Sequence, residues 1–92
     1  MFAIVYTGKM KRDVRLMKKR GKDISKLTDA LSLLASGKPM PPKYRDHQLK
    51  GSLADFRECH IEGDWLLIYQ VFEDMLILSA SGTGSHSDLF NE

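Results

Sequence analysis

The sequence contains three histidines, each placed near other side chains that can take part in chemistry. His47 lies among basic residues, and His60 is followed four positions later by Asp64. His86 stands four residues before Phe90, a spacing that puts two side chains on one face of a helix. Because imidazole gains or loses a proton near neutral pH, these histidines are candidates for general acid and general base catalysis.

A metal site is the first alternative for these side chains. Cys59, His60, Asp64 and His86 are all of ligand type, but neighbouring residues of a strand point to opposite faces, so Cys59 and His60 cannot easily reach one ion. The sequence also lacks CxxC, HxH and HExxH spacings. We therefore expect no metal and no cofactor. Cys59 is expected to be a small core residue rather than a nucleophile.

Cleavage of RNA is the second alternative, and it needs only side chains that this sequence offers. RNA carries its own nucleophile, the 2′-hydroxyl, so an enzyme must accept that proton, stabilise charge on the phosphate and protonate the leaving 5′-oxygen. Exposed aromatic rings stack on unpaired bases, and Trp65 and Phe90 are the candidates. Packing in the core is the alternative for both rings. Trp65 begins a strand beside a turn, so we expect it at a sheet edge.

Charge is distributed unevenly along the chain. The net charge is +2, but residues 1–50 hold 13 Lys and Arg against 4 Asp and Glu, whereas residues 51–92 hold 1 against 8. The densest basic stretch covers residues 9–22, with eight basic residues and one acid. This asymmetry indicates a polyanionic partner such as nucleic acid, although a solvated helix face would also account for it.

The N-terminal third predicts one strand and two helices that position these groups. Residues 2–6 are β-branched and aromatic and predict a strand. Helical spacing of Met10, Val14 and Met17 predicts an amphipathic helix after Thr7 as its cap, ending at Gly21. A second helix is predicted from an Asp23 cap to Gly37 and Pro39, antiparallel to the first. Its apolar face consists of Ile24, Leu27, Ala30, Leu31 and Leu34.

The remainder of the chain predicts a long connection and three strands. Residues 37–55 are rich in Pro and Gly and form an irregular but ordered connection. Strands are expected at 56–61, 65–72 and 75–80, as an antiparallel meander joined by short turns. A glycine-rich turn and a short terminal helix follow. The predicted class is α+β in βααβββ order, with both helices packed on one face of a small antiparallel sheet.

Length and composition predict a single domain spanning residues 1–92. The mass of 10.5 kDa is at the small end of what folds alone. Cys59 is the only cysteine, which excludes a disulfide within the chain and fits a reducing cytoplasm. No apolar run approaches the roughly 18 residues of a membrane-spanning helix, and the N-terminus has no signal-peptide pattern. We expect no membrane association.

Three segments together resemble a known family. They are "YRDHQLKG" (44–51), "FRECHIEGDWLLIY" (56–69) and "GTGSHSDLF" (82–90). The pattern is similar to the YafQ branch of the RelE-type bacterial toxins. The resemblance implies a RelE-like fold and an mRNA interferase that cuts messenger in the A site of the 70S ribosome, through the 2′-hydroxyl and without metal. Adenine-rich lysine codons would be favoured, and the protein partner would be a cognate antitoxin that blocks the toxin.

The resemblance also implies roles for particular residues. His47, His60, Asp64 and His86 would be catalytic, with His86 the leading candidate for the general acid. Trp65 and Phe90 would complete the site. The basic helix would contact phosphates of ribosomal RNA. Its residues are Lys9, Lys11, Arg12, Arg15, Lys18, Lys19 and Arg20.

Gly82 departs from the family pattern, in which an arginine that binds phosphate is expected at this position. Loss of such a contact commonly costs about two to three orders of magnitude in rate. The resemblance therefore implies either an attenuated toxin or a positive charge supplied by Lys50, Arg45 or Arg57.

Two other functions fit parts of the sequence. A toxin-fold binding protein without nuclease activity, as in ParE-like relatives, would share the architecture but would not need the three histidines. A small RNA-binding module unrelated to toxins would explain the basic N-terminal half, but not the histidines and aromatic residues near the ends of the predicted elements.

Overall fold

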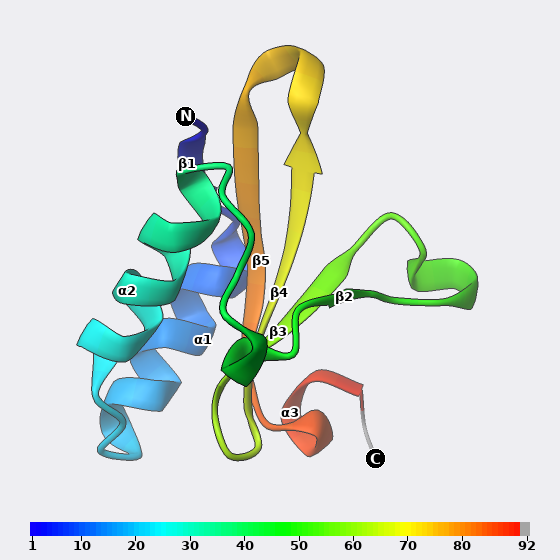
Figure 1. Cartoon of the computed structure of the whole chain (residues 1–92). Helices are drawn as coiled ribbons and strands as arrows, with labels where there is room; N and C mark the ends of the chain where they lie inside the picture. The colour runs from blue at the N-terminus through cyan, green and yellow to red at the C-terminus, as the bar shows by residue number, and fades with distance from the viewer. Residues whose placement is uncertain (91–92) are drawn as a thin grey trace.

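The computed structural model describes residues 1–90, which form a mixed sheet with two helices on one face and one short helix on the other (Figure 1). Among these residues, no helix is long and apolar enough to cross a membrane. The regular elements, in chain order, are β1 (Ala3–Tyr6), α1 (Gly8–Lys19), α2 (Ile24–Ala35), β2 (His47–Gln48), β3 (Arg57–Glu62), β4 (Trp65–Phe72), β5 (Ile77–Gly84) and α3 (His86–Phe90).

The sheet has five strands in the order β1-β5-β4-β3-β2. β1 pairs with β5 in parallel, and the other three pairs are antiparallel. The expected α+β class and the helices on one face are confirmed, and the order agrees with βααβββ apart from one additional strand. The sheet is mixed rather than wholly antiparallel, because β1 runs parallel to β5. The additional strand is β2, which lies within the long connection of residues 37–55. Its two residues are too few to show the alternation by which a strand is predicted.

Both long helices begin at the expected caps. The Thr7 hydroxyl accepts a hydrogen bond from the Met10 amide, and Asp23 accepts one from the Ser25 amide. Their apolar stripes meet the sheet, where Met10 and Leu27 are fully buried with Leu67 of β4. The antiparallel helices therefore cover one face of the sheet (Figure 1).

The other face of the sheet carries the polar residues of β3. Cys59 is fully buried in the helix-covered core, as expected, and burial raises the pKa of its thiol to about 12. Alternation then places Glu58 and His60 on the opposite face, where they pair with Ile68 and Leu66 of β4. The short helix α3 lies toward this side of the sheet (Figure 1).

The last strand differs from its prediction at both ends. Residues 73–75 form a 3-10 turn, so β5 begins at Ile77 rather than at residue 75. The strand continues to Gly84, and the predicted glycine-rich turn is wrong because that segment pairs with β4. A register shift leaves Ser81 as an extra residue, since Tyr69 pairs with Ala80 and Ile68 with Gly82.

Candidate active site

Glu58 lies at the centre of the three histidines. Its side chain is only 5% exposed, and it lies within 3.4–3.6 Å of an Nε2 atom from each of them. Oε2 lies 3.5 Å from His47, and Oε1 lies 3.6 Å from His60 and 3.4 Å from His86. A buried carboxylate therefore links imidazoles from three separate elements of the chain.

Sheet pairing explains how these residues meet. His47 is the direct cross-strand neighbour of Glu58 in the β2–β3 ladder. His60 lies two residues further along β3, on the same face as Glu58. His86 is the first residue of α3, which follows β5. His86 therefore lies just beyond the end of β5, and its side chain returns to Glu58 of β3.

Asp64 orients His86 from the turn between β3 and β4. Its Oδ1 lies 2.6 Å from Nδ1 and 3.4 Å from the backbone nitrogen of His86. The hydrogen bond from the His86 side chain lowers the pKa of Asp64, so this carboxylate is ionised at neutral pH and accepts a hydrogen bond from Nδ1. Nε2 is then the atom that faces Glu58.

The backbone orients His47 in a similar way. Nδ1 lies 2.8 Å from the carbonyl oxygen of Arg45, to which it donates a hydrogen bond. Arg45 itself adopts a left-handed conformation with φ of 46°. In its neutral form His47 therefore keeps Nε2 as a proton acceptor, directed toward Glu58.

Two buried polar atoms of this cluster lack hydrogen bonds. Among residues 1–90, neither Oε1 of Glu58 nor Nδ1 of His60 has a hydrogen-bond partner. Leaving such an atom unsatisfied costs about 1–3 kcal/mol. An arrangement that sacrifices stability in this way is characteristic of sites selected for chemistry rather than for folding.

An apolar pocket adjoins the histidine cluster. Its cavity volume is about 220 Å³, and Phe90 forms one wall. The rings of Phe90 and His86 lie 6.0 Å apart, on one face of α3 as their spacing predicted. Phe56, Ile68 and Leu53 line the pocket, together with Lys9 and Gly82. The pocket thus offers an apolar surface, beside His86, against which a flat aromatic group could pack.

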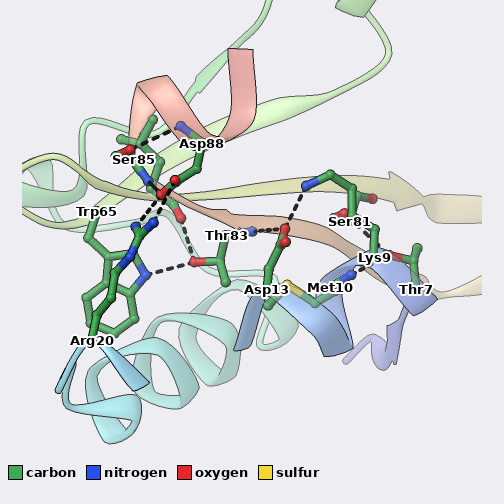
Figure 2. A network of polar contacts seen from close by, with 11 residues as sticks. Thr7, Lys9, Met10, Asp13, Arg20, Trp65, Ser81, Thr83, Ser85 and Asp88 are labelled. Atoms are coloured by element: carbon green, nitrogen blue, oxygen red, sulfur yellow. Dashed lines mark hydrogen bonds and ion pairs between the residues drawn. The ribbon is translucent and has the colours of Figure 1, made fainter. Parts of the chain in front are cut away.

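Trp65 does not belong to this surface. It is 2% exposed, and its Nε1 donates a hydrogen bond of 2.8 Å to the Thr83 hydroxyl (Figure 2). The expectation of a sheet-edge ring that contacts substrate is wrong, because Trp65 is packed in the buried core together with Met17 of α1. Trp65 is therefore a core residue, which was the alternative considered for it from the sequence.

Two arginines that were expected to contact phosphate or RNA bind other side chains of the protein instead. Arg57 lies on the other face of β3 from Glu58 and donates hydrogen bonds to Asp46 (3.0 Å) and Tyr69 (3.2 Å), so it does not join the histidines. Arg20 donates two hydrogen bonds to Asp88 of α3, at 2.5 and 2.9 Å (Figure 2). It thus holds α3 against the end of α1.

The remaining basic side chains are exposed. Arg45 and Lys50 flank β2 on either side of His47. Lys9 forms an ion pair with Asp13 at 2.6 Å. Their contacts with RNA stay predictions, as do those of the other exposed basic residues of α1, which are Lys11, Arg12, Arg15, Lys18 and Lys19.

Glu58 is the residue that sequence reasoning omitted from the site. Its signal was present, since strand alternation placed it on the face of His60, and a carboxylate buried within a strand requires partners. The partners themselves come from residues 47 and 86, and no local pattern joins those positions to β3.

Comparison with known proteins agrees with this architecture. The model of a family described as "Bacterial toxin of type II toxin-antitoxin system, YafQ" matches residues 2–91. The "mRNA interferase toxin YafQ" of Escherichia coli strain K12 is 41% identical over 88 residues, covering 95% of this chain and 94% of the relative.

Two solved structures extend the comparison. The E. coli DinJ–YafQ complex contains a chain with a TM-score of 0.88 and 38% identity, covering 98% of this chain and 99% of that one. A metal-bound toxin from Helicobacter pylori has a TM-score of 0.92 and 42% identity, covering 98% and 100%. The predicted RelE-like fold is confirmed, and the chain belongs to the YafQ family of bacterial toxins of type II toxin–antitoxin systems.

Proposed function

We propose that this chain is a ribosome-dependent mRNA interferase that cuts messenger in the ribosomal A site by attack of the 2′-hydroxyl, without a metal. The observation that carries the proposal is the placement of three histidine Nε2 atoms within 3.4–3.6 Å of the buried Glu58 carboxylate. The name of the E. coli relatives, mRNA interferase toxin, supports the same reaction.

Exposure divides the cluster into an outer and an inner pair. The side chains of His47 and His86 are 51% and 41% exposed, whereas those of His60 and Glu58 are 14% and 5% exposed. The outer pair is the more accessible to a bound phosphodiester. We therefore assign the two proton transfers to His47 and His86, and a supporting role to the inner pair.

In the proposed reaction His47 is the base. Its Nε2 takes the proton of the 2′-hydroxyl while the 2′-oxygen attacks phosphorus. The imidazolium that forms is stabilised by the Glu58 carboxylate 3.5 Å away. His86 is the acid, and its Nε2 gives a proton to the 5′-oxygen as the bond from phosphorus to that oxygen breaks. The products are a 2′,3′-cyclic phosphate and a 5′-hydroxyl.

Exposed basic residues on α1 support contact with the ribosome, where they would neutralise RNA phosphates. The proposed site of action is accordingly the cytoplasm. The DinJ–YafQ complexes support a cognate antitoxin as the protein partner of this chain.

The test is cleavage of messenger on ribosomes programmed with an AAA codon in the A site. We expect the chain to cut this messenger, to leave free messenger intact, and to produce a 2′,3′-cyclic phosphate end. His86→Ala should lose at least about 100-fold in rate, whereas Ser87→Ala, at the exposed next position, should not. Equal cutting by wild type and His86→Ala would remove His86 from the mechanism. Absence of cutting by the wild type would favour a toxin-fold binding protein without nuclease activity.

A further inference from the structure

β1 pairs with only the first half of β5, and beyond it Thr7 and the first turns of α1 contact the second half of that strand. β1 pairs with residues 77–80, and beyond them Thr7 donates its hydroxyl to the carbonyl of Ser81. Further along β5, the carboxylate of Asp13 accepts a hydrogen bond of 3.2 Å from the backbone amide of Thr83. Figure 2 shows Asp13 between Thr83 and Lys9. The start of α1 is therefore fixed beside Gly82.

The ammonium of Lys9 lies where a side chain at position 82 would begin. A Cβ atom built on Gly82 would be 3.2 Å from Lys9 Nζ and 3.3 Å from Asp13 Oδ2. Gly82 does not have the positive φ that makes glycine necessary at Gly84. The glycine is thus explained by space rather than by backbone conformation, and its lack of a side chain accommodates the Lys9–Asp13 pair.

Lys9 reaches the pocket that adjoins His86. Its side chain is 52% exposed, and it lines the pocket together with Phe90, whose ring is 6.0 Å from that of His86. Asp13 receives one hydrogen bond from the ammonium, which leaves further N–H groups for another acceptor. An RNA strand with a base against Phe90 would pass its phosphate along this side of the pocket.

We propose that Lys9 binds a phosphate of the RNA substrate and supplies, from α1, the positive charge that position 82 lacks. This inference rests on the proposed function, and it concerns a residue that the sequence assigned to ribosomal RNA. Asp13 positions the ammonium, with its own orientation fixed by the Thr83 amide. The toxin then needs no side chain at position 82 for full activity.

The test compares four variants on the programmed ribosomes. Lys9→Ala should lower kcat/KM for cleavage by about 10–100-fold. Lys38→Ala removes an exposed lysine that lies outside α1 and has no assigned RNA contact, and it should change kcat/KM less than about threefold. Gly82→Arg should give no gain while Lys9 is present. The double variant Lys9→Ala/Gly82→Arg should recover at least about tenfold over Lys9→Ala, since the arginine would occupy the space of the lost ammonium.

Equal rates for Lys9→Ala and Lys38→Ala, or no recovery in the double variant, would overturn the proposal. A gain from Gly82→Arg with Lys9 intact would show instead that the chain is attenuated by its glycine. A second assay separates this inference from the nuclease assignment. It measures binding to ribosomes whose messenger has a 2′-deoxynucleotide at the cut site, which lacks the attacking hydroxyl and is not cleaved. Lys9→Ala should weaken that binding and lower its salt dependence even if the wild type did not cut, and unchanged binding would contradict the role.

Discussion

Arg20, immediately after α1, donates hydrogen bonds to both carboxylate oxygens of Asp88 in α3, joining segments 68 residues apart in the chain. Asp88 also accepts the Ser85 amide at 2.9 Å, and Ser85 in turn accepts the Asp88 amide, as in a capping box. α3 carries His86 and Phe90. The ion pair therefore positions two site residues from the far end of the basic helix.

Arg20 and Asp88 should act as one unit in cleavage. We expect Arg20→Ala and Asp88→Ala each to lower the cleavage rate by about tenfold or more, and the double variant to be no worse than Asp88→Ala alone. A rate assay on programmed ribosomes with all three variants measures this coupling. Strictly additive losses would mean that Arg20 acts through ribosomal RNA instead.

The attachment of α3 should weaken in acid. Hydrogen bonds from Arg20 and from the Ser85 amide hold the pKa of Asp88 well below its usual value, and His86 lowers that of Asp64. A carboxylate with a lowered pKa in the folded state stabilises the fold above its unfolded pKa, which is about 3.9 for Asp, and this stability is lost as pH falls through the folded pKa.

Thermal unfolding between pH 5 and 2 measures this effect. The melting temperature of the wild type should fall in this range more steeply than that of Asp88→Asn. Asp29→Asn, which removes an exposed carboxylate of α2, serves as the matched charge control and should follow the wild type. Parallel curves for wild type and Asp88→Asn would refute the linkage.

Glu58→Gln should separate activity from stability. The amide keeps the shape of the side chain but removes the negative charge shared by three imidazoles, so cleavage should fall about 100-fold. The buried oxygen that lacks a hydrogen bond no longer carries charge, so the free energy of unfolding should stay equal or rise by about 1 kcal/mol. Urea unfolding measures the stability, and cleavage on programmed ribosomes measures the activity. A Glu58→Gln variant that is less stable and fully active would contradict the role of Glu58 in cleavage.

Trp65→Phe should affect folding rather than substrate binding. The smaller ring leaves a gap in the core and removes the hydrogen bond to Thr83, at a cost of about 1–3 kcal/mol in unfolding free energy. KM for programmed ribosomes should not change at a temperature where the variant is folded. Phe90→Ala is the comparison, because it should raise KM through the pocket while the core remains intact. A raised KM for Trp65→Phe without a loss of stability would instead show that Trp65 contacts the substrate.

Cleavage should not require a transition metal bound to the toxin. Toxin treated with a chelator and then freed of it should cut messenger at the untreated rate in magnesium buffer that preserves ribosomes. Among residues 1–90, no group of three or more His, Cys, Asp or Glu side chains is arranged to hold an ion. Restoration of a lost rate by added copper or zinc would contradict this account.

Local sequence patterns predicted the elements that carry their own signals. The stripe of Met10 and Met17 and the caps at Thr7 and Asp23 lie within single helices, where spacing and side-chain chemistry suffice. The ends of β5 could not be predicted from local sequence patterns. Its glycines resemble a turn, and only pairing with β4 and the close approach of Lys9 and Asp88 explain Gly82 and Gly84 as strand residues.

Contacts between distant segments account for what the sequence did not reveal about the site. The histidines were found by type, but Glu58 acquires its role from cross-strand pairing with His47 and from the return of α3. Arg20 resembled its basic neighbours on the helix, and its partner lies at the other end of the chain. Trp65 was misplaced because its burial in the core depends on tertiary packing that its position beside a turn does not reveal.

The pH dependence of single-turnover cleavage on programmed ribosomes tests the central claim most directly. If His47 accepts a proton and His86 donates one, the rate should fall toward acid as His47 becomes protonated and toward alkali as His86 loses its proton. His47→Ala should remove the acid limb, and His86→Ala the alkaline limb, at reduced rates. A wild-type profile that is flat from acid to alkaline pH, or limbs that both persist in the two variants, would contradict acid–base catalysis by this pair.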